Sequence, residues 1–397
     1  MTASPTDPTG PGHASGTGSA INAGPGVDMG TKASSSTGAA TSTPNGAPSD
    51  VTSGTPDSTV PDTILAIDGG GTHTRAVLLT RDAGVLAHAS GPGCNPFDRP
   101  EWAQNLHDLL HRMRHPALQA ATLGMAGYDA ARPSSAEQEQ VARAGLAAPV
   151  GGAIRLWLEN DVETAHRAAF GGGAGVFVLA GTGSVAMARG AGGQIARVGG
   201  WGWLLGDEGG GYWIGRKALG HVTRFLDGAA RREAAFATAL LHRLGLPATG
   251  DNAADALREW VRTRAHPRSA MAALAHVVDD LAHAGDMQAT ALLQRAGTHL
   301  ARQARLAASR VTPTTGHMPE HTPVVWSYGG SVMNSLTVRH TVAEHLGAAP
   351  LPPALPPLGG AALRSAELAG WAWDETCRAR LGNALARIFP ADGQTNA

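Results

Sequence analysis

Cysteine is scarce in this chain of 397 residues, which contains only Cys94 and Cys377. The two lie far apart, and the sequence has no CxxC pair and no cluster of cysteine with histidine. This spacing argues against a structural zinc site or an iron–sulfur cluster held within one chain. Because two isolated thiols fit a reducing compartment, we expect a cytoplasmic protein.

Lysine is almost absent as well, and neither sign of charge predominates. Lys32 and Lys217 are the only lysines, and the formal net charge is −1. Without a basic field, we expect no nucleic acid and no membrane surface among the partners. No stretch is apolar and uncharged for long enough to cross a bilayer, and the start of the chain does not have the basic and apolar regions of a secretory signal. These absences predict a soluble protein.

Aromatic side chains are missing from residues 1–60, which also contain few large aliphatic ones. A segment rich in Ser, Thr, Gly, Pro and Ala cannot bury enough apolar surface to offset the entropy lost on ordering, so we expect a disordered tail. The rest of the chain suits two domains, which we place at residues 61–170 and 171–397. Between about residues 229 and 309 the sequence is rich in Ala, Leu, Arg and His at helical spacing, which predicts a helical block in the second domain.

Apolar periodicity predicts that strands and helices alternate along the folded part. Strands are expected at Ala117–Leu123, Ile154–Leu158 and Val324–Ser327. Helices are expected at Glu101–His115, at Ser134–Gly145, from about Gly360, and at Trp373–Ile388. We expect the last helix to pack back on the first domain.

A buried strand that ends in three glycines is the most informative local pattern. In Ile64–Arg75, ILAIDGGGTHTR, an apolar run leads into a carboxylate, glycines and hydroxyls. Glycines let backbone N–H groups approach a bound anion closely, so this hairpin is a candidate phosphate site. The residues concerned are Asp68, Gly69, Gly70, Gly71, Thr72 and Thr74. A glycine-rich turn without a ligand is the alternative.

A second strand–turn–strand unit follows at Gly175–Met187, GVFVLAGTGSVAM. Its turn carries Gly181, Thr182, Gly183 and Ser184. Two such hairpins suit a clamp that holds a nucleoside triphosphate from two sides. They also imply two duplicated halves.

With these two hairpins the chain resembles the superfamily of sugar kinases, Hsp70 and actin. The segments Gly199–Leu219 and Trp326–Val332 narrow the resemblance to the N-acetylglucosamine kinase and BadF/BadG ATPase family. The resemblance covers about residues 62–375. It implies an α/β fold of two ribonuclease H-like (actin-like ATPase) domains with a cleft between them, with ATP and Mg²⁺ bound, an amino sugar as substrate, and a possible homodimer.

Phosphoryl transfer needs a carboxylate to take the proton of the acceptor hydroxyl. Asp161 follows a predicted strand and precedes Thr182 by 21 positions, as the resemblance implies for the base. Its alternative role is a plain helix N-cap. Asp129 is the rival carboxylate, interpreted here as a sugar-pocket residue. Asp68 would face the phosphates, which requires a cation between them, so we assign it to hydrated Mg²⁺.

Sugar recognition is expected in the loop Gly199–Gly211, which offers aromatic faces and carboxylates. The resemblance implies that Gly200, Trp201 and Asp207 contact the hexosamine, with Glu208 beside them. Asn95 also matches a sugar-binding asparagine, although an Asn-Pro turn is the simpler explanation of this residue taken alone. Trp203 and Trp213 are interpreted as core residues. The adenosine side is expected at Gly329, Gly330 and Ser331.

These features predict an ATP-dependent amino-sugar kinase, with the 6-hydroxyl of N-acetylglucosamine as the expected acceptor. Glucosamine kinase is the nearest alternative, because recognition of the acetyl group depends on pocket shape. A BadF-type ATPase that drives a partner protein is a second alternative, against which the cysteine count argues. A sugar-responsive regulator is a third, but the sequence has neither a helix-turn-helix segment nor a basic patch.

Overall fold

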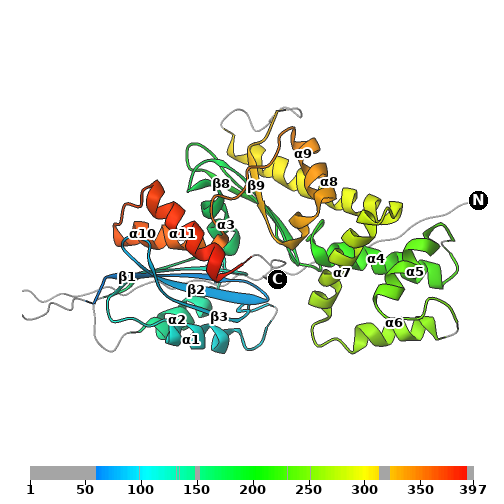
Figure 1. Cartoon of the computed structure of the whole chain (residues 1–397), viewed down its shortest axis with the longest axis horizontal. Coiled ribbons are helices and arrows are strands. Elements are labelled where there is room, and N and C mark those ends of the chain that lie inside the picture. The colour runs from blue at the N-terminus through cyan, green and yellow to red at the C-terminus, as the bar shows by residue number, and fades with distance from the viewer. Residues whose placement is uncertain are drawn as a thin grey trace, which may run out of the picture. The chain divides into compact units, whose positions relative to one another are not determined.

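The computed structural model describes residues 60–390, apart from residues 98, 131, 134, 148–152, 230, 251 and 313–321. The tail expected over residues 1–60 therefore lies outside the described residues except for Val60. Two β-sheets and the helices that cover them make up the described part (Figure 1). This confirms an α/β protein.

The first sheet has the strand order β3-β2-β1-β4-β5. Its strands are β1 (Thr63–Gly69), β2 (His73–Thr80), β3 (Val85–Pro92), β4 (Leu118–Met125) and β5 (Arg155–Asn160). The first three are antiparallel neighbours, whereas β4 pairs parallel with both β1 and β5. Because β1 is central, all of its residues except Asp68 are buried, which explains its unbroken apolar run.

Two layers of helices cover the first sheet. Helices α1 (Trp102–Arg112) and α2 (Ser135–Leu146) lie on one face, and α10 (Pro357–Ala369) and α11 (Glu375–Ile388) on the other (Figure 1). In α11, Leu381 and Leu385 join Ile64 of β1 in one apolar cluster. The last helix of the chain thus packs on the sheet built from the start of the fold.

The second sheet has the order β8-β7-β6-β9. Its strands are β6 (Gly175–Ala180), β7 (Ser184–Arg189), β8 (Ile195–Gly199) and β9 (Trp326–Gly329). Strands β6, β7 and β8 are antiparallel neighbours, and β9 is parallel to β6. This sheet therefore repeats the pairing of β1–β4 in the first sheet.

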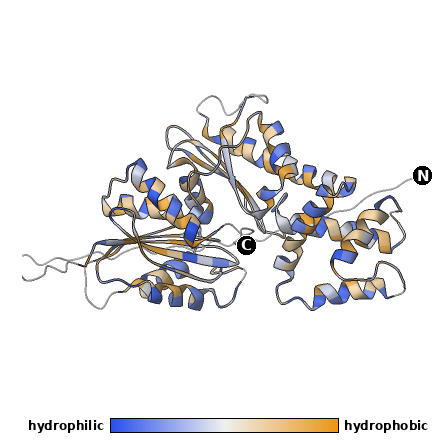
Figure 2. Ribbon diagram, viewed as in Figure 1, coloured by the Kyte–Doolittle hydropathy of each residue, from blue (hydrophilic) through white to orange (hydrophobic). Residues whose placement is uncertain are grey.

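A helical segment lies between β8 and β9 in sequence. It consists of α4 (Gly211–Leu226), the short 3-10 helix η1 (Arg231–Glu233), α5 (Ala234–Arg243), α6 (Ala253–Arg262), α7 (Pro267–His283) and α8 (Met287–Val311). A second 3-10 helix, η2 (Ser331–Asn334), and α9 (Leu336–Leu346) follow β9. Hydrophilic and hydrophobic residues alternate along α6 and α8 (Figure 2), as expected for helices with one buried face.

Helix α3 (Asp161–Phe170) packs against elements of both sheets. Val162 and Ala165 belong to an apolar cluster with Phe177 of β6. Elsewhere on α3 the helix meets α10 so closely that a Cβ on Gly360 would lie 1.9 Å from the carbonyl oxygen of Thr164. Only glycine permits this approach of two backbones.

Several predicted boundaries were wrong by a few residues. The helix expected at Glu101–His115 is shorter at both ends, and the helix expected from Gly360 begins at Pro357. Trp373 precedes α11 and donates its indole N–H to the carbonyl oxygen of Arg81 at 2.8 Å. In the described part of the chain, no helix is both long enough and apolar enough to span a bilayer.

Candidate active site

A cleft of about 930 Å³ is lined by the turns of both glycine hairpins. Eleven of the residues predicted to take part in binding or catalysis line it: Gly71, Thr72, Asn95, Asp161, Gly181, Thr182, Gly183, Ser184, Gly200, Trp201 and Asp207. The other nine do not line it: Asp68, Gly69, Gly70, Thr74, Asp129, Glu208, Gly329, Gly330 and Ser331. The two hairpins, far apart in sequence, therefore border one space.

The first hairpin is held by its own backbone and by the segment that follows β3. The N–H of Gly70 donates to the carbonyl oxygen of His73 at 3.0 Å, which closes the turn. A Cβ on Gly93 would lie 2.1 Å from the carbonyl oxygen of Gly71, so only glycine at position 93 lets these two backbone segments come so close. Thr74 is buried and donates its hydroxyl to the carbonyl oxygen of Pro92 at 2.9 Å. Its hydroxyl is thus committed inside the protein, unlike the exposed Thr72.

The second hairpin is anchored to the start of α4. The N–H groups of Gly211 and Tyr212 donate to the carbonyl oxygens of Gly181 and Thr182 at 2.7 and 3.0 Å. The Ser184 hydroxyl donates to the backbone carbonyl of Glu208 at 2.8 Å. Glu208 therefore supports the hairpin through its main chain, although the sequence had suggested a role for its carboxylate in sugar binding.

Asp207 lies beneath the second hairpin. Its backbone has a φ of 59°, which is rare for a residue other than glycine. Its carboxylate accepts the N–H of Ser184 at 3.4 Å and forms an ion pair with Arg268 at 3.3 Å. Burial raises the pKa of Asp207, while the Ser184 amide and Arg268 lower it. A strained, buried carboxylate that still borders the cleft is typical of a functional position.

Asp161 is the first residue of α3 and not its N-cap. The cap is Asn160, whose side chain accepts the N–H of Val162 at 3.2 Å. The alternative role of Asp161 as a plain helix N-cap is therefore wrong, and its carboxylate lies at the cleft. Burial raises the pKa of Asp161, and the nearby Arg197 is the main opposing influence.

Asp68 lies behind Asp161 at the end of β1. Burial and the negative charge of Asp161 together raise the pKa of Asp68 to about 6, while Arg75 lowers it. A carboxylate whose pKa is raised by a neighbouring carboxylate lies in a negative field that attracts a cation. Hydrated Mg²⁺ needs few direct protein ligands, so this pair fits the ion through bound water. Among the described residues, no group of three or more His, Cys, Asp or Glu side chains is arranged to hold a metal directly.

The predicted sugar side is only partly assembled around the cleft. Trp201 is 73% exposed and lines the cleft, whereas Asp129 lies outside the lining and pairs with Arg132 at 3.3 Å. The side-chain oxygen of Asn95 accepts the N–H of Phe97 at 3.1 Å, as in an Asn-Pro turn, yet Asn95 still borders the cleft. The prediction that Trp203 is a core residue was wrong, since it too is exposed and lines the cleft.

The predicted adenosine loop follows β9 and touches the second hairpin. Gly330 has a φ of 90°, and a Cβ there would lie 2.4 Å from the carbonyl group of Ala180 and 2.7 Å from the N–H nitrogen of Gly181. The two backbones are therefore in direct contact. Although Gly329, Gly330 and Ser331 do not line the cleft, they lie directly behind one of its walls.

Four arginines in the cleft were missed from the sequence: Arg99, Arg132, Arg197 and Arg268. Arg99 and Arg132 lie in loops, Arg268 lies in the first turn of α7 and Arg197 on the edge strand β8, with no shared motif. One signal could have pointed to them. In a chain with almost no lysine, a cationic side chain that binds phosphate is expected to be arginine, so arginines near the glycine hairpins were the natural candidates. Lys217 itself lies over the ring of Trp213 at 5.8 Å and does not line the cleft.

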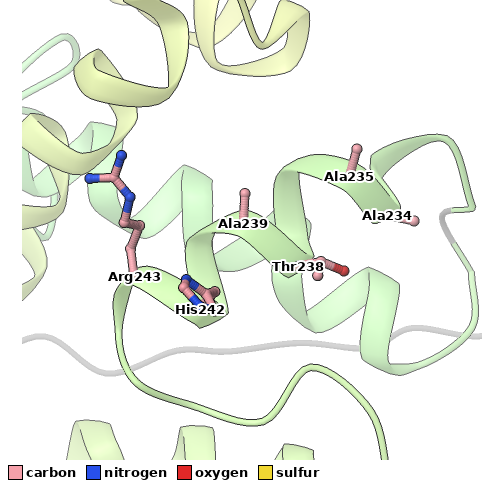
Figure 3. A pocket seen from close by; sticks show the side chains of 6 residues that line it. All are labelled: Ala234, Ala235, Thr238, Ala239, His242 and Arg243. Carbon is pink, nitrogen blue, oxygen red and sulfur yellow. The ribbon is translucent and has the colours of Figure 1, made fainter. Parts of the chain in front are cut away.

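A second hollow, of about 560 Å³, lies on the surface of α5. All six of its lining residues belong to that helix (Figure 3): Ala234, Ala235, Thr238, Ala239, His242 and Arg243. Arg243 forms an ion pair with Asp280 at 3.3 Å. Because no predicted site residue borders this hollow, the chemistry is assigned to the cleft between the hairpins.

Comparison with known proteins identifies one family. A family model described as the BadF/BadG/BcrA/BcrD ATPase family matches residues 65–364. The chain is also 30% identical over 172 residues to the N-acetylmuramic acid/N-acetylglucosamine kinase of Clostridium acetobutylicum, a match that covers 41% of this chain and 54% of that protein. It is 26% identical over 180 residues to the N-acetyl-D-glucosamine kinase of Dictyostelium discoideum, which covers 41% and 55%. The matches thus span about half the length of these curated relatives.

A crystal structure from Chromobacterium violaceum is similar over a longer stretch. It is a structural genomics target named as a candidate N-acetylglucosamine kinase. The TM-score is 0.59 at 25% identity, and the match covers 76% of this chain and 98% of that one. The family resemblance inferred from Gly199–Leu219 and Trp326–Val332 is therefore confirmed.

Proposed function

The chain belongs to the BadF/BadG/BcrA/BcrD ATPase family, and from this premise we propose that it is an ATP-dependent kinase of amino sugars. Because this is a family of ATPases, ATP is the proposed phosphoryl donor. The observation that carries the proposal is the shared cleft, in which two glycine hairpins and the carboxylate of Asp161 border one space. A phosphate clamp beside a candidate base is the arrangement that phosphoryl transfer to a hydroxyl requires.

In this proposal the two halves of the molecule are copies of one ribonuclease H-like domain with the nucleotide between them. The repeated strand pairing of the two sheets supports the duplication. The backbone amides of Gly71 and Gly183 lie on turns that border the cleft and can donate to phosphate oxygens. Gly330, in contact with the second hairpin, would carry the adenosine.

Asp161 would take the proton of the sugar hydroxyl. It is the carboxylate that borders the cleft at the start of a helix, where the amide of Val162 at 2.9 Å keeps its oxygen oriented. Asp68 and Asp161 would hold hydrated Mg²⁺, which when bound neutralises phosphate charge. Asp129 is assigned to the sugar pocket, and its ion pair with Arg132 would position the arginine that borders the cleft.

The acceptor is proposed to be N-acetylglucosamine, phosphorylated at the 6-hydroxyl, with glucosamine as the alternative. Charge favours the acetylated sugar, because the described lining has four arginines against the carboxylates of Asp161 and Asp207. A free amine would add a further positive charge. Exposed apolar side chains at Phe97, Leu204 and Leu205 also line the cleft and suit an acetyl methyl group.

The test is acceptor-dependent release of ADP with a panel of hexoses and hexosamines. We expect N-acetylglucosamine to raise ADP release strongly and to give a product whose mass and fragmentation fit a 6-phosphate. A much higher kcat/KM with glucosamine would establish the alternative acceptor. ATP hydrolysis that no sugar stimulates would reject the sugar kinase in favour of an ATPase that drives a partner protein.

A further inference from the structure

Arg197 differs from the other arginines of the cleft in having an uncommitted guanidinium. Arg99 donates to the carbonyl oxygen of Gly71 at 3.0 Å, Arg132 pairs with Asp129, and Arg268 pairs with Asp207. Within the part of the chain that the structure describes, the Arg197 side chain makes no hydrogen bond or ion pair, although it borders the same cleft.

The position of Arg197 brings its charge to the candidate base. It lies on β8, opposite Met187 of β7, and its terminal nitrogen reaches within 2.7 Å of the place a Cβ would occupy on Gly200. Its positive charge opposes the rise in pKa that burial causes at Asp161 and Glu163, both in the first turn of α3. The second sheet thus contributes a cation to the cleft that Asp161 also borders.

We infer that Arg197 is a further catalytic residue, which binds the phosphoryl group as it passes from ATP to the acceptor oxygen. The inference rests on the proposed kinase function and adds a residue to it. During transfer, a bond forms between the acceptor oxygen and the γ-phosphorus, and the bond from that phosphorus to the β–γ bridging oxygen breaks. The electron pair leaves with ADP, and the hydroxyl proton goes to Asp161.

Charge explains why an arginine is needed at this position. The moving phosphoryl group approaches the negative carboxylate of Asp161, so an uncompensated cleft would repel it. A guanidinium keeps its proton throughout the reaction and can donate two parallel hydrogen bonds to phosphate oxygens. An arginine that is paired with a carboxylate would first have to leave that ion pair, whereas Arg197 can bind phosphate without breaking an ion pair.

The test compares Arg197→Ala and Arg197→Lys with the wild-type protein. We expect Arg197→Ala to lower kcat by about 10²–10³-fold, the loss typical when one transition-state donor is removed, while the KM for the sugar changes little. Added guanidinium should restore part of the rate of Arg197→Ala. The lysine variant should be only partly active, because it cannot donate in the same planar geometry. Arg189→Ala, on the neighbouring strand and outside the cleft lining, is the matched control and should not respond to guanidinium.

A binding measurement separates catalysis from folding. Arg197→Ala should retain its affinity for ADP but lose affinity for ADP with aluminium fluoride, which mimics the transferring group. Unchanged kcat, or a loss confined to the KM for the sugar, would overturn the inference. The same variants are assayed for ATP hydrolysis without sugar. If no sugar accepts phosphate, the kinase proposal fails, and the effect of Arg197→Ala on hydrolysis still decides the role of this arginine.

Discussion

Replacing Asp68 by Asn is expected to stabilise the free protein at neutral and alkaline pH. The pKa of Asp68 is raised from 3.8 to about 6, mainly by burial and also by Asp161. The folded state therefore binds this proton more tightly than the unfolded state, so the stability contributed by this group is present at low pH and is lost as pH rises through about 6. Above that pH, the folded wild-type protein carries an unfavourable, partly buried charge at Asp68 that the amide does not carry.

The size of the effect follows from the two pKa values. A rise from 3.8 to about 6 corresponds to at most about 3 kcal/mol of unfolding free energy at high pH. Between pH 8 and pH 5, the wild-type protein should recover about 1.4 kcal/mol relative to Asp68→Asn, since Asp68 is then largely protonated in the folded state. For a protein of this size, about 1 kcal/mol shifts the Tm by roughly 2 °C.

The assay is thermal unfolding without nucleotide or Mg²⁺ at both pH values. Asp68→Asn should have the higher Tm at pH 8, with the difference reduced at pH 5. Asp255→Asn is the control, because it removes one carboxylate that is 78% exposed on α6 and should give the same difference from wild type at both pH values. A difference for Asp68→Asn that does not depend on pH, or a lower Tm at pH 8, would refute the argument from burial and repulsion.

Four further predictions concern the base, the packing, the tail and the nucleotide. Asp161→Asn should lower kcat by about 10²–10⁴-fold with ATP and sugar binding retained, and near-normal turnover in this variant together with a large loss in Asp129→Asn would exchange their roles. Gly360→Ala should lower the unfolding free energy by about 1–3 kcal/mol in denaturant titration, because the new Cβ would enter the backbone of α3, whereas Gly181→Ala, with nothing within 4 Å of its Cβ, should not. A chain shortened to begin at Val60 should keep its Tm and rate, and a large loss in either would show that the tail contributes to the fold. Saturating ATP should raise the Tm of the wild type in proportion to the logarithm of its concentration, and no shift would count against nucleotide binding.

The sequence was sufficient for features that depend on neighbouring residues. The apolar run before Asp68 predicts β1 because a central strand needs apolar side chains on both faces, and the glycines that follow it predict the turn. The second hairpin was found in the same way. The predicted ends of helices were less accurate than their existence. Neighbouring residues of similar chemistry, such as Asn160 and Asp161, can each serve as the N-cap, and local sequence patterns do not decide between them.

Residues brought to the cleft from distant elements were not predictable in this way. Arg268 lies in the first turn of α7 and pairs with Asp207, 61 positions away in sequence, so no local pattern joins them. Arg197 lies on β8, an edge strand whose exposed residues give a weak signal. Conversely, Thr74 looked suitable for phosphate because of its place in the motif, but strand pairing directs its hydroxyl to Pro92.

Helix α3 has a mechanical consequence, because it is in contact with both halves of the fold. Apolar side chains bind it to β6, and the glycine contact with α10 binds it to the first sheet. If one half rotates relative to the other, the displacement of each atom grows with its distance from the rotation axis. Because α3 is held by both halves, that axis is expected to pass close to α3. Asp161 is the first residue of α3 and would lie near this axis, whereas the two glycine turns belong to the halves that would move. Asp161, the proposed base, would then keep its position while the glycine turns move toward it, and the close contact at Gly360 would limit how freely the two halves rotate.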